Sequence, residues 1–449
     1  MVSAVLFITF FVLLVLNVPI SICLGLSSAA AILYSGTSLT IVATNIYSGI
    51  SKFLLLAIPF FVLSGNIMAK AGISTRLIRF VDTCVGHRKG GIANVCIIVA
   101  CFFGAISGSG PATVAALGAV LIPAMVERGG FSAPFSTAIM ATASSIAIVI
   151  PPSIAFVVYA SITGVSIGDM FMAGIVPGIL MGLALIIVVM LEVRKNHVVP
   201  SNVQKASAKE RLDAFKDAFW GFLMPVIILG GIYGGIFTPT EAAAVSVVYG
   251  LFVGMVIYKE VKLKDLWDIL IDSAKTTGGI MLIVACASLF SFVCTRFGIS
   301  AAASQLLAKV AGNQFTFLLI CNVIFLIAGC FIDANSAMYI FIPIMLPVCK
   351  QLGYNVIAFG IMATVNLAIG QVTPPVGVNL FVAIGVKLKN GLQVTLQQIS
   401  RAVVPMVAAC IVVLLMITYI PGISTFLPAA LGSAAAVENG TTTGGDSGT

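Results

Sequence analysis

The fold is decided by an interruption in an apolar segment: residues 92–127 contain the sequence Ser107-Gly108-Ser109-Gly110-Pro111 near their middle. Residues 315–350 repeat this arrangement, with Asp333-Ala334-Asn335-Ser336 as the interruption. A helix needs about 20 residues to cross a hydrocarbon core about 30 Å thick, so each segment is too long for one crossing. We therefore expect two re-entrant hairpins of two half-length helices each, with tips that are buried in protein or face water.

The composition around the hairpins is that of a membrane protein. Of the 449 residues, 60% are hydrophobic and 8% are charged, against roughly 25% charged in a soluble protein. This composition excludes a water-soluble enzyme and predicts an all-α polytopic membrane protein. Ten further apolar segments have the length of a helical crossing, namely 2–18, 20–48, 52–70, 133–163, 171–192, 217–237, 241–258, 276–297, 355–386 and 401–421.

Positive charge is distributed unevenly over the loops. If the loops alternate across the membrane, 19 of the 23 Lys and Arg fall on one side, and the other side receives only Lys52, Arg296, Lys309 and Lys350. The positive-inside rule assigns the first side to the cytoplasm and places both termini outside. The net charge of +8 is thus explained by topology, and we expect no nucleic-acid partner.

The chain contains an internal repeat. Four matches at nearly one offset support it: Gly72-Ile73-Ser74 with Gly298-Ile299-Ser300, Pro123 with Pro347, Ile139-Met140-Ala141-Thr142 with Ile361-Met362-Ala363-Thr364, and Pro151-Pro152 with Pro374-Pro375. Each copy contains five spans and one hairpin. Because five is odd, the second copy is predicted to be inverted in the membrane, with a proline-broken helix in each copy.

The repeat divides the chain into four parts. The first copy is 1–192, with its hairpin at 92–127 and its broken helix at 133–163; the second is 217–425, with its hairpin at 315–350 and its broken helix at 355–386. Between them, 193–216 is predicted to be a cytoplasmic amphipathic linker, because apolar residues recur at helical spacing near its end; a simple linker is the alternative. The polar, Gly-rich segment 426–449 is predicted to be a disordered tail.

The proline breaks offer backbone oxygens. Proline has no N–H, so Pro151 and Pro374, each with the proline after it, remove the usual helical donors from carbonyls such as those of Ile148 and Gln371. Inverted repeats with broken helices are typical of secondary transporters, which bind substrate and coupling ions at these breaks; a purely structural duplication is the alternative. We predict one sodium site where each tip meets its break, with a carboxylate substrate between the two sites.

Two charged residues have a binding and a structural interpretation each. Asp333 lies within an apolar segment, where a carboxylate is costly and therefore points to function. It is also suited to cap the second half of its hairpin, and the two roles are compatible. Arg296 ends the span 276–297 and is suited either to clamp a carboxylate or to reach the membrane surface.

Neither catalysis nor a bound cofactor is expected. The tip at Gly108-Ser109-Gly110 is superficially similar to the nucleophile loop of an intramembrane serine protease, but His87 and His197 both lie in charged loops, where they cannot act as its base. The ten Cys show no metal-type pairing and are interpreted as small hydrophobic residues. Sodium is expected as the coupling ion only.

Three motifs together resemble the large membrane subunit of tripartite ATP-independent periplasmic (TRAP) transporters over about residues 1–425. They are Phe103-Gly104-Ala105-Ile106-Ser107-Gly108-Ser109-Gly110-Pro111-Ala112-Thr113-Val114-Ala115-Ala116, Ile150-Pro151-Pro152-Ser153 and Val372-Thr373-Pro374-Pro375-Val376-Gly377-Val378-Asn379. The resemblance implies sodium-coupled import of an organic acid across the bacterial inner membrane by an elevator mechanism. It also implies a periplasmic substrate-binding protein and a separate four-helix membrane subunit as partners.

The resemblance further implies individual site residues. The first sodium site takes Ser107, Gly108, Gly110, Ser144, Ser145 and Ile150, and the second takes Asp333, Asn335, Gly370, Thr373 and Pro374. From the residues themselves, we expect the substrate to contact Arg296, Ser109, Ser153 and Asn379. C4-dicarboxylates, sialic acid, other sugar acids and keto acids are the implied substrate class, with a slight preference for sialic acid. The alternatives are a stand-alone sodium/carboxylate symporter that needs no binding protein and, less compatible with two localised polar clusters, a channel.

Overall fold

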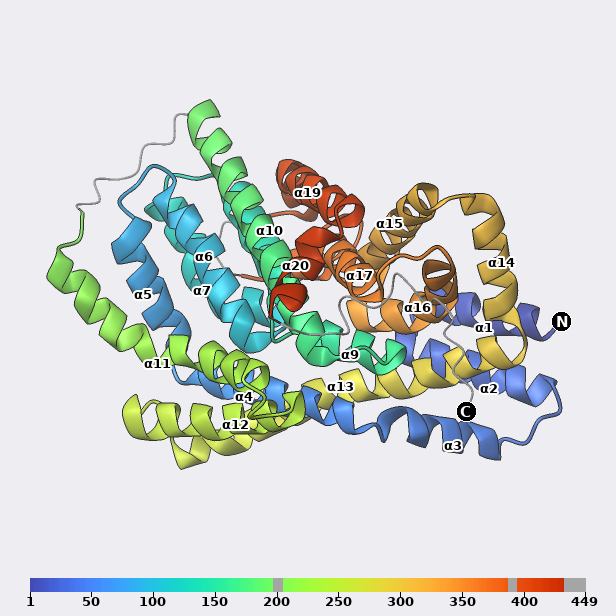
Figure 1. The fold of residues 1–449 in the computed structure, drawn as a ribbon. Coiled ribbons are helices and arrows are strands. Elements are labelled where there is room, and N and C mark those ends of the chain that lie inside the picture. Colours follow the sequence, from blue (N-terminus) through green and yellow to red (C-terminus); the bar gives the residue numbers. More distant parts are fainter. Residues whose placement is uncertain (197–204, 387–393, 432–449) are drawn as a thin grey trace, which may run out of the picture.

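The computed structural model describes residues 1–196, 205–386 and 394–431, and every regular element within them is a helix (Figure 1). His197 and most of the predicted tail lie outside the described residues. Among the described residues, eight helices are long and apolar enough to cross a membrane. The predicted all-α membrane fold is confirmed.

The first half of the chain leads through one hairpin and one broken helix to a long helix. Its elements are α1 Val2–Val15, α2 Ile20–Tyr34, α3 Thr40–Ile50, η1 Phe53–Leu56, α4 Ala57–Lys70, α5 Ile73–Val85, α6 Gly91–Ser107, α7 Gly110–Glu127, α8 Ala133–Ser145, η2 Ile146–Ile148, α9 Ile154–Thr163 and α10 Ile167–Lys195. We call α6–α7 hairpin 1, residues 107–110 tip 1, and residues 148–153, from the last residue of η2 to the start of α9, break 1.

The second half repeats this order. Its elements are α11 Ala208–Tyr233, α12 Pro239–Phe252, η3 Val253–Ile257, α13 Leu263–Arg296, α14 Ile299–Ala311, α15 Gln314–Phe331, α16 Ala334–Gln351, α17 Val356–Gly370, α18 Val378–Ile384, α19 Leu396–Tyr419 and α20 Gly422–Ala430. We call α15–α16 hairpin 2, residues 332–335 tip 2, and residues 371–377 between α17 and α18 break 2. Hairpin, broken helix and long helix thus follow one another in both halves.

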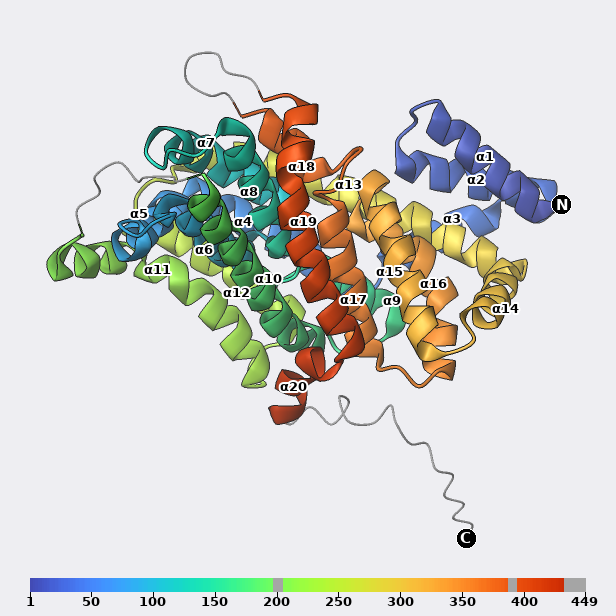
Figure 2. The same ribbon diagram turned by 90° about the horizontal axis from the view of Figure 1, so that it is seen from above.

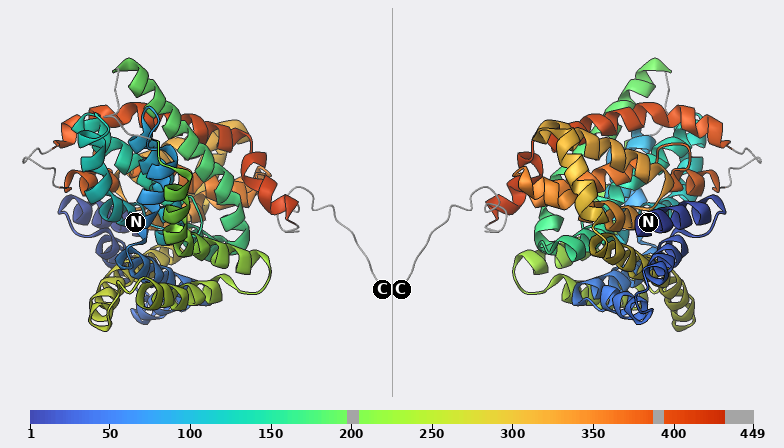
Figure 3. Two further views of the ribbon diagram at one scale, coloured as in Figure 1. Left: turned by 90° about the vertical axis from the view of Figure 1, so that its left-hand side faces the viewer. Right: turned by 90° about the vertical axis from the view of Figure 1, so that its right-hand side faces the viewer.

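The helices form two layers. In one layer, the long helix α13 packs along α2, α3 and α4, and α12 packs on α4; this layer lies along the lower side of Figure 1 and below the hairpins in the end-on views of Figure 3. In the other layer, α7 packs on α8 and α15 on α17. The two halves interlock in this second layer, because α19 runs beside α17 and also contacts α8 (Figure 2).

Each hairpin approaches its broken helix through a glycine. A Cβ atom on Gly104 would lie 2.7 Å from the Cα of Ala147, and one on Gly329 would lie 3.0 Å from the Cα of Gly370. Gly104 and Gly329 both lie three residues before the first residue of their tip. Because real Cβ atoms do not approach other atoms so closely, only glycine lets the hairpins lie this near the breaks.

Several predicted segment lengths need correction. The hairpin arms contain 17, 18, 18 and 18 residues, about 27 Å for the longer ones, so they are not half-length. The predicted span 20–48 is two helices, because the chain turns at Gly36 with a φ of +70°. The helices α1 and α2 have 14 and 15 residues and are therefore shorter than the predicted crossings.

The predicted linker and tail also differ from the described helices. The helix α10 continues to Lys195, and the amphipathic stretch after Ser207 is the beginning of α11, not a separate surface helix. A capping box at Ser207 and Glu210 starts α11 there. In the predicted tail, α20 extends to Ala430, and its Pro428 is buried against the fold; residues 432–449 lie outside the described part.

The glycine contact predicts that Gly370→Ala destabilises the protein. A Cβ atom on Gly370 would lie 2.5 Å from the Cα of Gly329, and overpacking of this kind costs about 1–3 kcal/mol. We expect a lower melting temperature in detergent than for the wild type. The matched control is Gly278→Ala on α13, where an added Cβ meets nothing within 4 Å, so its melting temperature should be equal or higher. Equal melting temperatures for wild type and Gly370→Ala would contradict the packing argument.

Candidate functional site

The helix breaks recover most of the hydrogen bonds that proline removes. Both Pro-Pro bonds, Pro151-Pro152 and Pro374-Pro375, are cis. The Ser153 hydroxyl donates to the Ile148 carbonyl at 2.6 Å, and the Asn379 N–H donates to the Gln371 carbonyl at 3.1 Å. The carbonyls that the sequence marked as lacking helical donors are therefore satisfied by the breaks themselves, and the side chains around them are the stronger candidates for binding.

Tip 1 packs against break 1. Gly108 has a φ of +60°, and a Cβ atom there would lie 2.8 Å from the Pro152 carbonyl oxygen. The Ser144 and Ser145 hydroxyls donate back to their own helix at 2.6 and 2.8 Å. Because their protons are used in this way, both hydroxyl oxygens keep lone pairs that are suited to a small cation. At the tip, the Ser107 hydroxyl shares a hydrogen bond of 2.9 Å with Thr113.

Tip 1 also contacts break 2, which the sequence analysis did not anticipate. Measured from the position of a Cβ atom on Gly110, the Asn379 Oδ1 lies at 3.0 Å and the Gln371 Oε1 at 3.1 Å. The Asn379 amide donates to the Ser144 hydroxyl at 3.2 Å. Asn379 therefore joins break 2 to the helix that leads into break 1, and the two predicted sodium sites are parts of one connected polar region.

Tip 2 is organised by Asp333. One carboxylate oxygen accepts from the backbone N–H groups of Asn335 and Ser336 at 2.9 and 3.1 Å, and the other accepts from the Ser336 hydroxyl at 2.5 Å. Asp333 is thus the N-cap of α16. The Gly377 N–H donates to the Cys330 carbonyl at 3.3 Å, so tip 2 lies against break 2. The capping interpretation of Asp333 is confirmed, and it leaves a free lone pair on Oδ2.

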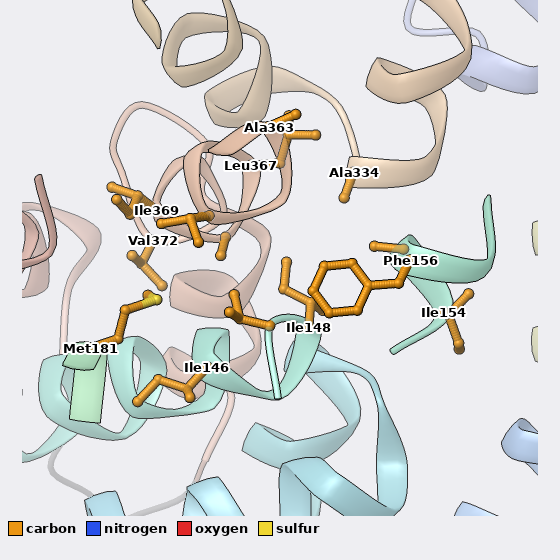
Figure 4. Close-up of a cluster of buried hydrophobic side chains, with 14 of the residues drawn as sticks. Ile146, Ile148, Ile154, Phe156, Met181, Ala334, Ala363, Leu367, Ile369 and Val372 are labelled. Atoms are coloured by element: carbon orange, nitrogen blue, oxygen red, sulfur yellow. The ribbon is translucent and has the colours of Figure 1, made fainter. Parts of the chain in front are cut away.

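A cavity of about 390 Å³ separates the two tips from α13. Both breaks reach it, through Ile148 and Gln371, and α13 contributes Lys275 and Thr276. The lining also includes Ser109, Gly110, Asp333 and Asn335. One wall is apolar, because Ile148, with Phe156, Ala334 and Leu367 around it, belongs to the buried hydrophobic cluster (Figure 4). The lining also includes a cation, a carboxylate and two amides, from Lys275, Asp333, Asn335 and Gln371.

Several amide oxygens in this region have no hydrogen-bond partner. Within the described part of the chain, no donor reaches Asn335 Oδ1, Gln371 Oε1 or Asn379 Oδ1, although all three atoms are buried. Buried acceptors of this kind are rare in native proteins and call for an explanation. Amide and carbonyl oxygens are suitable ligands for a hard cation such as sodium. The unpartnered oxygens of this region therefore fit the predicted ion.

Arg296 is not brought to the cavity. It ends α13, 21 residues beyond Lys275, which corresponds to roughly 31 Å along the helix. Its exposed guanidinium lies 6.0 Å from the ring centre of Phe292. Ile150, Thr373 and Pro374 are likewise absent from the lining. In the described residues, Lys275 is the only Lys or Arg in that lining.

Sequence reasoning missed two residues of the cavity. Lys275 was assigned to ordinary cytoplasmic loop charge, and nothing in the sequence places it opposite the tips. Gln371 was considered only for its carbonyl. A signal for Gln371 was present, since it stands three residues before Pro374, and Ile148 stands three residues before Pro151. A polar residue that replaces an apolar one in the second copy marks a position where the two halves differ in chemistry.

Comparison with known proteins identifies the family. Residues 7–423 match the family described as the tripartite ATP-independent periplasmic transporter, DctM component. The chain belongs to this family. The predicted resemblance to TRAP large membrane subunits is therefore confirmed, and the relatives of this chain are transporter permeases.

Three relatives illustrate the range of the family. The chain is 42% identical over 412 residues to the C4-dicarboxylate TRAP transporter large permease of Pseudomonas aeruginosa, covering 91% of this chain and 94% of the relative. It is 36% identical over 410 residues to the 2,3-diketo-L-gulonate TRAP transporter large permease of Escherichia coli, covering 89% and 94%. It is 42% identical over 423 residues to the isethionate TRAP transporter permease of Oleidesulfovibrio alaskensis. That alignment covers 94% of this chain but 66% of the relative.

The fold has a solved counterpart. The YdaH transporter of Alcanivorax borkumensis, described as having an unusual topology, aligns with a TM-score of 0.60 over 87% of this chain and 88% of its own, at 14% sequence identity. At this identity the likeness concerns the fold alone.

The geometry of tip 2 predicts different effects for two substitutions of Asp333. Asp333→Asn keeps an oxygen that can cap α16 but removes the charge, whereas Asp333→Ala also removes the cap, at a cost of about 0.5–2 kcal/mol. We expect Asp333→Asn to melt near the wild-type temperature and to lose most sodium-dependent uptake, and Asp333→Ala to lose both uptake and stability. Normal sodium dependence of uptake in the Asn variant would show that the carboxylate acts only as a cap.

Proposed function

We propose that this protein imports an organic acid across the bacterial inner membrane, driven by a sodium gradient. The observation that carries the proposal is the meeting of both tips and both breaks at one cavity of about 390 Å³. Small-molecule sites in proteins are typically about 300–1,000 Å³. The N-termini of α7 and α16 both start at this cavity, and helix N-termini favour anions.

A C4-dicarboxylate is the first candidate substrate. The support comes from the relatives, several of which are C4-dicarboxylate permeases, and from Lys275, whose ammonium group provides a counter-charge for one carboxylate. The N-terminus of α7, which has no side-chain cap, supplies N–H donors for the other. Sialic acid remains a second candidate, as a larger acid that carries one carboxylate.

The coupling ions are assigned to the two tips. Sodium site 1 takes oxygens of Ser107 and Gly108, at the C-terminal end of α6, and of Ser144 and Ser145. Sodium site 2 takes oxygens of tip 2 and break 2, with Asp333 as its charged ligand. The support is the unpartnered amide oxygens of Asn335 and Asn379 and the lone pairs of the Ser144 and Ser145 hydroxyls. Binding of cations at both tips lowers the cost of placing an anion between them.

Two partners complete the transporter. A periplasmic substrate-binding protein delivers the acid, and a small membrane subunit supports the layer that contains α4, α12 and α13. The isethionate permease, of which this chain spans 66%, has additional sequence that this chain does not align with. Both termini are placed in the periplasm. The layer of hairpins and broken helices moves as an elevator against the other layer, which it contacts through bonds such as that from Lys52 Nζ to the Ser161 carbonyl at 2.7 Å.

The experiment that tests this proposal is uptake of labelled acids into proteoliposomes that hold this chain and its small membrane partner. Under an inward sodium gradient, we expect uptake of L-malate or succinate only when the binding protein is present. Empty liposomes and a collapsed gradient are the controls. Uptake that needs sodium but no binding protein would indicate the stand-alone symporter instead, and uptake of sialic acid alone would change the substrate but not the mechanism.

A further inference from the structure

The two breaks present different chemistry to the cavity. Three residues before its first proline, break 1 presents Ile148 and break 2 presents Gln371, and both line the cavity. Ile148 belongs to the buried hydrophobic cluster, whereas Gln371 carries an amide that is 94% buried, since only 6% of the residue is exposed. Features that both copies share are suited to two equivalent ions. A feature that only one copy has is suited to an asymmetric ligand, and the transported acid is the asymmetric ligand here.

The Gln371 amide is held in place but its oxygen is unused. Its backbone N–H donates to the Leu367 carbonyl at 3.0 Å, and its own carbonyl accepts from the Asn379 N–H at 3.1 Å. The side chain lies against Gly110, since Oε1 is 3.1 Å from the position that a Cβ atom on this glycine would take. In spite of this fixed position, no donor in the described residues reaches Oε1. A buried acceptor that is rigidly placed and unpaired is suited to a donor that arrives with a ligand.

A hydroxyl group fits this position better than a cation does. Gly110 begins α7, and the positive end of the α7 dipole disfavours a cation beside it. Lys275 also lines the cavity and carries a positive charge, which it shares with Asp272 at 3.6 Å. A hydroxyl on the transported acid donates one hydrogen bond without adding charge, while its carboxylates benefit from Lys275 and from the helix N-termini.

We propose that Gln371 is a specificity-determining residue that accepts a hydrogen bond from a hydroxyl group of the transported acid. The site then prefers hydroxy acids, such as malate or a sugar acid, over the same carbon skeleton without the hydroxyl. This inference rests on the proposed function, because it requires that the cavity binds the transported acid.

The test compares L-malate with succinate, which differ by one hydroxyl group. Dissociation constants are measured by titration of the purified complex of this chain with its small membrane subunit, in sodium chloride. We expect the wild type to bind L-malate more tightly, and Gln371→Met to lower this preference about tenfold, the value of one hydrogen bond. The affinity for succinate and the sodium concentration at half saturation should not change.

Two further variants keep the test decisive. Gln351→Met makes the same substitution at an exposed glutamine at the end of α16 and should leave the preference for L-malate intact. Gln371→Glu keeps an accepting oxygen, so it should weaken the binding of both acids by charge repulsion and retain the preference. If the Met variant does not fold, the Glu variant still tests the inference, because weaker binding of both acids is expected only if Gln371 lies beside the bound acid.

Other results would overturn the inference. Equal losses for both acids in Gln371→Met would indicate a structural role, and a shift in sodium half saturation with an unchanged preference would indicate a cation ligand. Equal binding of both acids to the wild type would also contradict it. Failure of the wild type to bind either acid would instead reject the C4-dicarboxylate assignment of the proposed function, and with it the inference in this form.

Discussion

The structure depends on one constraint: helices that are interrupted inside a membrane must satisfy the backbone groups that the interruption exposes. Each hairpin does this by lying against a break, and a glycine on each side permits the approach, Gly104 on Ala147 and Gly329 on Gly370. Within the breaks, Ser153 and Asn379 supply donors to the remaining carbonyls. The tips are therefore fixed relative to the breaks. The polar side chains between them are held in place by the packing of helices and not by long loops.

This packing also explains where the two halves of the molecule differ. Equivalent backbone positions are occupied by Ser109 in tip 1 and Asp333 in tip 2, which are the N-cap residues of α7 and α16, and by Ile148 and Gln371 beside the breaks. The shared backbone gives the two tips similar surroundings, and the differing side chains place an isoleucine beside break 1 and an amide beside break 2. A backbone that is repeated in both halves suits two sodium ions. Side chains that differ between the halves suit the single organic acid that is transported with them.

The architecture was largely predictable from the sequence, because proline pairs, interrupted apolar segments and a repeat offset are local patterns. The break residues Pro151 and Pro374 and the cap Asp333 were found in this way. The contact of Gly110 with Gln371 could not be predicted, because tip 1 packs against the other copy of the repeat. The place of Lys275 could not be predicted either, because counting charges assigns a residue to one side of the membrane and does not show which residues it faces. Arg296 was a plausible anion ligand that lies too far along α13.

The central claim is that the tips and breaks form one site that is carried across the membrane. The most direct measurement is the labelling of a Ser109→Cys variant with a membrane-impermeant maleimide, applied from one side and then the other in oriented vesicles, against a background without the substitution. The account predicts that sodium and the acid shift labelling between the two sides. Labelling from a single side under every condition would contradict it.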